Sequence, residues 1–244
     1  MPEPERQAFL DANVLRGHLQ TDILLTLADK GAFEPRWSAE VLDEVRRNRP
    51  PKLSEQAIDR RLDQMNRAFP QAMVSGYEHL MPAMQADAKD KHVLAAAVHS
   101  QSTVLVTENV KDFDPPSSGP HAMQVEKTSA FLNRLLSDNP ERTVAAMNEM
   151  ISRTDREPNS LAALVDKMAK QNDLKGFAQS FNAALPPDQR STSLQQTGGK
   201  AEKSATSAAF DGVAPAGGAT EAPAATPEAR KAPQGAEKGT DKEL

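Results

Sequence analysis

Short apolar runs alternate with longer amphipathic stretches along the first half of the chain. Five of these runs are bounded by polar or turn-forming residues, and we expect them to be strands: residues 8–11, 33–37, 71–74, 103–107 and 122–125. The stretches between them repeat their apolar residues at helical spacing. Because strands that alternate with helices favour a parallel sheet covered on both faces, the sequence predicts an α/β fold with a twisted parallel sheet flanked by helices.

Capping residues mark several of the expected helices. Ser38 is placed to cap a helix over residues 39–48, and a polar helix is expected from about Ser54 to Phe69. Residues 87–98 begin with Asp87 and Asp90 and continue into an Ala-rich helix, which leads into the fourth expected strand.

Beyond about residue 125 the pattern changes to helices only. Phe131 and Leu135 lie on one apolar stripe, and Asn139 followed by Pro140 is typical of a helix start. From residue 186 the chain is rich in Ala, Gly, Pro, Ser, Lys and Glu, and such a segment buries too little apolar surface to fold. We therefore expect three parts: an α/β domain over 1–125, a helical extension over 126–185 and a disordered tail over 186–244.

The composition excludes some kinds of metal site and limits how the chain could bind nucleic acid. The 244 residues include no cysteine, which excludes disulfides and thiolate metal ligands, and the net charge of −5 argues against bulk attraction to nucleic acid. No apolar run approaches the roughly 18 residues of a membrane span, and the first residues do not have the order of a signal peptide. We expect a cytoplasmic protein.

Carboxylates and amides follow two of the expected strands. Asp11 ends the first strand, and Thr107, Asn109 and Asp112 end or follow the fourth. Open parallel sheets bind ligands beyond the carboxyl ends of their strands. Asp90 precedes the fourth strand by one helix, and Glu44 lies on an earlier helix. Oxygen ligands that converge in this way suit Mg²⁺ or Mn²⁺, so these residues are candidates for a metal site.

Each candidate also has a structural explanation. Asp87 and Asp90 could serve as helix-start residues, and for Asp87 this is the preferred interpretation. Glu44 could pair on the surface with Arg47, and Asp112 could close a turn. Asp11 is harder to explain in this way, because a carboxylate at the end of a buried strand needs a partner. His92 and His99 have no third ligand at matching spacing and are interpreted as packing or surface residues.

Four short segments resemble the motifs of the PIN-domain family, and specifically its VapC-type toxins. They are Phe9-Leu-Asp-Ala-Asn-Val-Leu15, Val41-Leu-Asp-Glu-Val-Arg-Arg-Asn48, Asp90 ahead of Val93-Leu-Ala-Ala-Ala97, and Thr107-Glu-Asn-Val-Lys-Asp-Phe113. The resemblance covers about residues 8–125. The helical segment after it resembles an extension found in longer bacterial PIN toxins.

The resemblance implies a metal-dependent endoribonuclease that hydrolyses RNA with a metal-activated water. Asp11, Glu44, Asp90 and Asp112 would be the catalytic residues and the ligands of Mg²⁺ or Mn²⁺, supported by Asn13, Thr107 and Asn109. A cognate antitoxin and a homodimer are the expected partners, with no membrane. The alternatives are a weak or inactive PIN module that binds RNA or protein, and a PIN nuclease of RNA maturation.

Two features depart from the family pattern or add to it. The position two residues after Thr107 is Asn109 where the family often has an acid, which would weaken a second metal site. Arg46, Arg47 and Arg49 begin a run of basic residues just after Glu44, and this run is a candidate RNA-binding surface. A solvated helix face explains the same run equally well.

Overall fold

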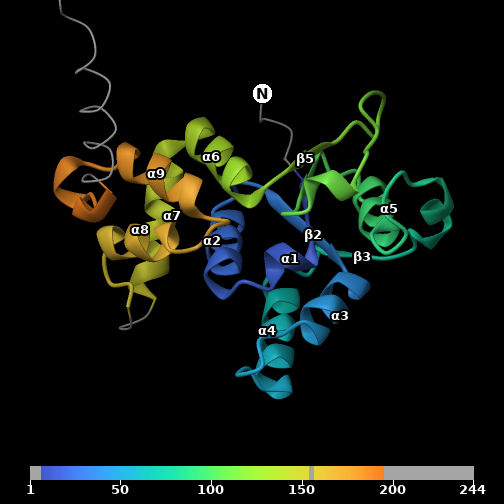
Figure 1. Cartoon of the computed structure of the whole chain (residues 1–244), viewed down its shortest axis with the longest axis horizontal. Coiled ribbons are helices and arrows are strands. Elements are labelled where there is room, and N and C mark those ends of the chain that lie inside the picture. Colours follow the sequence, from blue (N-terminus) through green and yellow to red (C-terminus); the bar gives the residue numbers. More distant parts are fainter. Residues whose placement is uncertain (1–6, 154–156, 195–244) are drawn as a thin grey trace, which may run out of the picture. The chain divides into compact units, whose positions relative to one another are not determined.

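The computed structural model describes residues 7–153 and 157–194. In the described part of the chain, five short strands form one sheet (Figure 1). The strands are β1 (Gln7–Leu10), β2 (Glu34–Ser38), β3 (Met73–Val74), β4 (Val104–Val106) and β5 (Gln124–Glu126).

Helices connect and follow these strands. The α-helices are α1 (Ala12–Leu15), α2 (His18–Asp29), α3 (Ala39–Arg47), α4 (Glu55–Ala68), α5 (Lys91–His99), α6 (Thr128–Asp138), α7 (Pro140–Ser152), α8 (Leu161–Ala169) and α9 (Lys175–Ala184). Within residues 7–153 and 157–194 there are also three short 3-10 helices: η1 (Glu78–Ala83), η2 (Val110–Asp112) and η3 (Pro187–Gln189). None of the described helices is long and apolar enough to span a membrane.

The sheet has the strand order β3-β2-β1-β4-β5, and every pair is parallel. β1 is the central strand, and the register aligns Leu10 with Val106 and Val106 with Glu126. The carboxyl ends of β1, β4 and β5 therefore reach the same edge of the sheet at the same level. This edge is where the sequence predicted that Asp11 and Thr107 would meet.

Both faces of the central strands are buried. Ala8, Phe9 and Leu10 of β1 are each fully buried, as are the three residues of β4 to within 2%. Successive residues of a strand point to opposite faces, so both faces must be covered. α5 contacts β1, β2 and β4 as the chain crosses from the edge strand β3 back to β4. The predicted α/β sheet flanked by helices is confirmed.

The capping residues act as the sequence indicated. The Ser38 side chain accepts a hydrogen bond from the Val41 N–H at the start of α3, and Ser54 does the same for Ala57 in α4. Asn139 caps α7 through the Arg142 N–H, with Pro140 as its first residue. These bonds satisfy donors that every helix leaves unpaired at its first turn.

Helices α6–α9 pack on one another and on the α/β part through α2. α7 contacts α2, and the rings of Phe33 and Phe131 meet edge to face with centroids 5.0 Å apart. The buried apolar residues from Ala8 to Leu185 form one continuous cluster. The expected helical extension therefore shares the core of the sheet.

The tail expected over 186–244 divides into a described and an undescribed part. Residues 186–194 contain η3, and Ser191 is buried, with its N–H donated to the Asn182 side chain. The described structure thus remains packed beyond residue 185, where the sequence pattern placed the start of the tail. The rest of that expected tail, 195–244, lies outside the described residues.

Candidate metal centre

Asp11 follows β1 directly and is held in place by three donors. Its Oδ1 accepts from the Ala12 N–H at 2.6 Å, so it caps the short helix α1. Its Oδ2 accepts from Asn13 Nδ2 at 2.7 Å and from Thr107 Oγ1 at 2.6 Å. The side chain is 6% exposed. A buried carboxylate with this many donors has a fixed orientation.

Asn13 and Thr107 join the ends of β1 and β4. Asn13 Nδ2 also donates to Thr107 Oγ1 at 3.0 Å, and Asn13 Oδ1 accepts from the Glu108 N–H at 3.1 Å. Thr107 Oγ1 accepts a further bond from the Asn109 N–H at 3.1 Å. Asn13, which the family resemblance gave as a supporting residue, is therefore bonded directly to Asp11.

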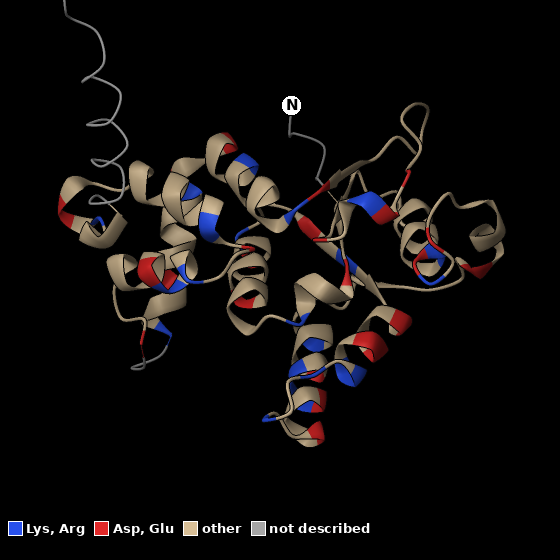
Figure 2. Cartoon of the chain, in the orientation of Figure 1, with Lys and Arg blue, Asp and Glu red and all other residues tan. Residues whose placement is uncertain are grey.

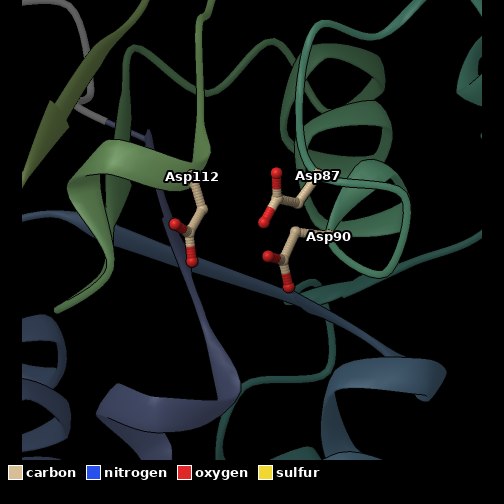
Figure 3. A group of neighbouring side chains, drawn as sticks. All are labelled: Asp87, Asp90 and Asp112. Atoms are coloured by element: carbon tan, nitrogen blue, oxygen red, sulfur yellow. The ribbon is translucent and has the colours of Figure 1, made fainter.

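Three further carboxylates form a tight group beside this edge. Asp87, Asp90 and Asp112 each offer one oxygen atom, and these atoms lie within 4.8 Å of one another. Figure 3 shows Asp112 extending from η2 and the other two from the turn before α5, with all three carboxylates facing one gap. Such a group of oxygen ligands matches the preference of Mg²⁺ and Mn²⁺.

Backbone pairing brings the two segments of this group together. The Asp87 N–H donates to the Asp112 carbonyl at 3.1 Å, and Ala86 and Phe113 form an antiparallel bridge. Asp90 is the N-cap residue of α5, although its side chain makes no capping hydrogen bond. The cap role expected for Asp87 is therefore wrong, since α5 begins after Asp90.

The acid group has little compensating charge. Asp90 Oδ2 is buried and has no hydrogen-bond donor among the described residues. Lys89 Nζ lies 3.3 Å from that oxygen and 3.9 Å from Asp112 Oδ2, as ion pairs that lack hydrogen-bond geometry. Lys89 is 68% exposed, so solvent screens its charge. A buried carboxylate oxygen without a donor fits a site that is completed by a cation.

Asp11 is electrostatically linked to two other predicted ligands. Burial raises its pKa, the hydrogen bonds from Thr107 and Ala12 oppose that change, and the charges of Glu44 and Asp90 raise the pKa further. Glu44 and Asp90 thus each lie close enough to Asp11 to repel its charge. Glu44 is half-buried on α3, whereas Asp43 beside it is exposed and pairs with Arg46.

Asp90 and Asp112 are in the tight group, and Asp11 and Glu44 are not members of it. Asn109 is exposed, and its backbone N–H binds Thr107. Asp87 is the addition that the sequence did not favour. Its signal was the spacing Asp87-x-x-Asp90, which was first interpreted as a helix start.

The basic run after Glu44 is mixed with acids in space. Arg46 pairs with Asp43 and with Asp59, the latter at 2.7 Å, and Arg49 Nη2 lies 3.9 Å from Glu55. Figure 2 shows blue and red segments interleaved along α3 and α4. Arg47 is exposed. The basic residues of this run therefore do not form a purely basic surface.

A groove of about 1230 Å³ lies at the other end of the strands. Its lining includes Glu34, Thr103 and Gln124, at the amino ends of β2, β4 and β5. The acids lie at the carboxyl ends. This groove is separate from the candidate metal centre.

Comparisons with known proteins agree with the fold and the motifs. Residues 7–111 match the family model of the PIN domain. Over 100 residues the chain is 33% identical to the protein named "Putative ribonuclease VapC50" from Mycobacterium tuberculosis (strain ATCC 25618 / H37Rv). Residues 7–111 therefore resemble a PIN domain, and this part of the chain resembles a VapC-type protein.

The likeness covers part of each protein. The aligned region is 41% of this chain and 59% of the relative, so the chain spans less than two thirds of the relative's length. No solved structure matches the chain significantly. The helices after residue 111 lie outside the family match.

Proposed function

We propose that the chain is a divalent-metal-dependent endoribonuclease and the toxin of a toxin–antitoxin pair. The observation that carries this proposal is the group of Asp87, Asp90 and Asp112 at the edge of a PIN-type sheet. The relative that matches the chain is named a ribonuclease. Glu44 and Asp90 each lie near enough to Asp11 for their charges to raise its pKa.

In this proposal Asp90 and Asp112 would hold Mg²⁺ or Mn²⁺. Asp11 and Glu44 are the other two ligands predicted from the sequence. Asp87 is a further candidate, because it lies in the group with Asp90 and Asp112. The donor-free, buried Asp90 Oδ2 and the hard oxygen ligands fit such an ion. When bound, the ion supplies Lewis-acid stabilisation of charge on a phosphodiester and lowers the pKa of a coordinated water.

The chain's own residues prepare the site. Thr107 and Asn13 fix the Asp11 carboxylate through two hydrogen bonds, so little reorganisation is needed when substrate binds. Lys89 offers an exposed positive charge beside the acids, where an RNA phosphate would approach. Asn109 is exposed at the end of the same loop and is available to contact substrate.

RNA would reach this edge past α3. We expect Arg47 to contribute more to RNA binding than Arg46, because Asp43 and Asp59 already offset the charge of Arg46. Replacing Arg47 and Arg49 by Gln should weaken RNA binding. It should also lower the slope of log affinity against log salt concentration by about two, as expected for the loss of two phosphate contacts. A filter-binding titration across salt concentrations measures the slope. An unchanged slope would remove Arg47 and Arg49 from the RNA-binding surface.

A cognate antitoxin and a homodimer are proposed from the VapC-type resemblance. An antitoxin segment that supplies a basic side chain to the acids would compete with the metal for the same carboxylates. Mn²⁺ should then weaken the binding of such an antitoxin to the toxin.

The proposed activity is tested with the full chain and three variants. Wild type should cleave single-stranded RNA with Mn²⁺, and Mn²⁺ should raise its melting temperature. Asp11→Asn and Asp90→Asn should lose cleavage, and Asp90→Asn should lose most of the thermal shift. Asp63→Asn removes an exposed acid of α4 and serves as the matched control.

The outcomes separate the alternatives. If both site variants cleave as well as the wild type, the assigned site is wrong. If the wild type shows neither cleavage nor a thermal shift with Mn²⁺, the chain is a non-catalytic PIN module.

A further inference from the structure

Helix α6 begins next to the loop that carries Thr107 and Asn109. β4 and β5 are paired with Val106 opposite Glu126, and the Thr107 N–H donates to the Glu126 carbonyl at 2.9 Å. Both strands end at this level. β4 continues into the loop of the candidate site, and β5 continues through Lys127 into α6.

α6 has no side-chain cap of its own. Its N-cap residue is Lys127, which makes no side-chain capping bond, and its first turn contains no acid. The Thr128 N–H is one of the donors that a helix leaves unpaired at its start. Glu108 Oε1 accepts from that N–H at 3.2 Å. The capping carboxylate of α6 thus comes from the candidate active-site loop.

The bond to Thr128 continues a chain of hydrogen bonds from Asp11. Asn13 donates to Asp11 through Nδ2 and accepts from the Glu108 N–H through Oδ1. Beyond Glu108, Thr128 Oγ1 accepts from Gln20 Nε2 on α2. Thr128 is fully buried and Gln20 is 2% exposed. The bond between Gln20 and Thr128 is buried and therefore costly to break, and the partly buried bonds of Asn13 and Glu108 connect it to the loop.

α6 is anchored to the helices that follow it. Phe131, Leu132 and Leu135 of α6 are buried, and α6 packs against α7 and α9. Ser129 Oγ accepts from the Phe177 N–H at 2.7 Å, which fixes the first turn of α9 to the first turn of α6. The N-terminus of α6 is therefore held in place by its neighbours, and the bond from Thr128 to Glu108 restrains the loop that carries Glu108.

We propose that Glu108 is a positioning residue of the metal site and that the extension α6–α9 fixes the site loop through it. The partial positive charge at the α6 N-terminus favours a carboxylate there, which keeps Glu108 in the capping position and away from the acid group. Glu108 then aligns Thr107 and Asn109 without binding metal itself. This role rests on the proposed metal-dependent function, and it gives the helical extension a part in that function.

The metal-binding experiment uses the full chain with Mn²⁺ as the probe. Glu108→Ala should weaken Mn²⁺ binding by about tenfold or more, the usual effect of losing a residue that orients metal ligands. Glu108→Gln should bind Mn²⁺ within about twofold of the wild type, because its amide oxygen can still accept from Thr128. Glu141→Ala, which removes an exposed acid from the first turn of α7, should behave as wild type. Isothermal titration measures all four proteins.

Two results of this titration would overturn the proposal. If Glu108→Gln binds Mn²⁺ as weakly as Glu108→Ala, Glu108 is a ligand. If both variants bind as wild type does, the loop does not depend on α6.

Hydrogen exchange measured without metal tests the coupling between the loop and α6 separately from the proposed activity. Glu108→Ala should speed exchange of the amides in 107–113 and 127–131, whereas Glu108→Gln and Glu141→Ala should not. Unchanged exchange in Glu108→Ala would refute the coupling even if the chain binds Mn²⁺. A wild type that fails to bind Mn²⁺ while Glu108→Ala shows faster exchange would refute the proposed function and the metal-site role, and would leave a structural coupling only.

Discussion

At the scale of single residues, the site depends on how buried polar groups find partners. Asp11 would be costly at the end of a buried strand without donors, and Ala12, Asn13 and Thr107 supply them. Asp90 lacks such donors at one oxygen and has only an exposed lysine beside it. The two carboxylates therefore have different roles: Asp11 is oriented by the chain, and Asp90 is left available to a ligand.

Thr107→Val tests the orientation of Asp11. The substitution keeps the shape of the fully buried side chain and removes the hydroxyl that donates to Asp11 Oδ2. We expect the free energy of unfolding to fall by about 1–3 kcal/mol, because a buried carboxylate loses a charge-assisted bond. Urea unfolding measures it. Thr103→Val, at the exposed amino end of the same strand, is the control and should change little; equal losses in the two variants would contradict the assigned role.

Lys89→Gln tests whether the lysine competes with metal for the acids. Its pKa is raised chiefly by its side-chain contact with Asp90 and the charge of Asp90, with a smaller effect from the charge of Asp112. Removing that charge should tighten Mn²⁺ binding several-fold, since the like charge of the lysine opposes a divalent cation at the same carboxylates. Lys111→Gln removes an exposed charge from η2 and should have a smaller effect. Titration with Mn²⁺ compares the variants, and weaker binding in Lys89→Gln would show that the lysine supports the site.

At the scale of elements, α2 and α7 are joined by charged groups at the edge of their apolar contact. Lys30 and Arg153 both pair with Glu149, and Arg153 also lies 3.3 Å from Asp29. The hydrogen bonds from Lys30 and Arg153 lower the pKa of Glu149. This network joins the sheet-forming part of the chain to the helical extension.

The lowered pKa predicts a dependence of stability on pH. The folded chain holds the Glu149 proton less tightly than the unfolded chain does, so the network stabilises the fold above the ordinary glutamate pKa of about 4.3. That contribution is lost as the pH falls through the pKa of the folded state. Glu149→Gln should lower the melting temperature at pH 7, and this difference should shrink as the pH falls towards 3. Thermal unfolding from pH 3 to 7 tests this, with Glu141→Gln as the control; a constant difference between variant and wild type would contradict it.

The elements themselves were largely predictable, for a physical reason. Central parallel strands are buried on both faces, so Ala8–Leu10 and Val104–Val106 appear in the sequence as continuous apolar runs. The edge strand β3 is only two residues long, with Met73 39% exposed, and its predicted length was too great. Caps at Ser38 and Asn139 depend on neighbouring residues alone and were correctly placed.

Features that depend on distant pairing were not predictable. Asp87 joins the acid group because its N–H bonds to the Asp112 carbonyl, a contact across 25 positions that no local pattern reveals. Glu108 escaped notice for the same reason, since its partner Thr128 follows another strand. Local sequence indicated the candidate site residues, while long-range backbone contacts decide which of them meet.

At the scale of the whole molecule, the family match ends before the fold does. Residues 7–111 match the PIN domain, yet β5 completes the sheet and α6–α9 share its core. Phe33 of the matched region packs against Phe131 beyond it, and α2 packs against α7. The matched region alone therefore lacks cover for part of its apolar surface.

Two truncations test whether the helical extension is needed for folding. A chain that ends after Lys127 keeps the five strands but exposes Phe33 and the face of α2 that packs against α7. We expect it to aggregate or to lose cooperative urea unfolding, because an exposed core face has no other cover. A chain that ends after Leu194 keeps every buried apolar residue of the described structure and should unfold with the midpoint of the full chain. Near-ultraviolet circular dichroism and urea titration compare the two. Cooperative unfolding of the shorter chain at the full-length midpoint would mean that α6–α9 add nothing to the stability of the sheet.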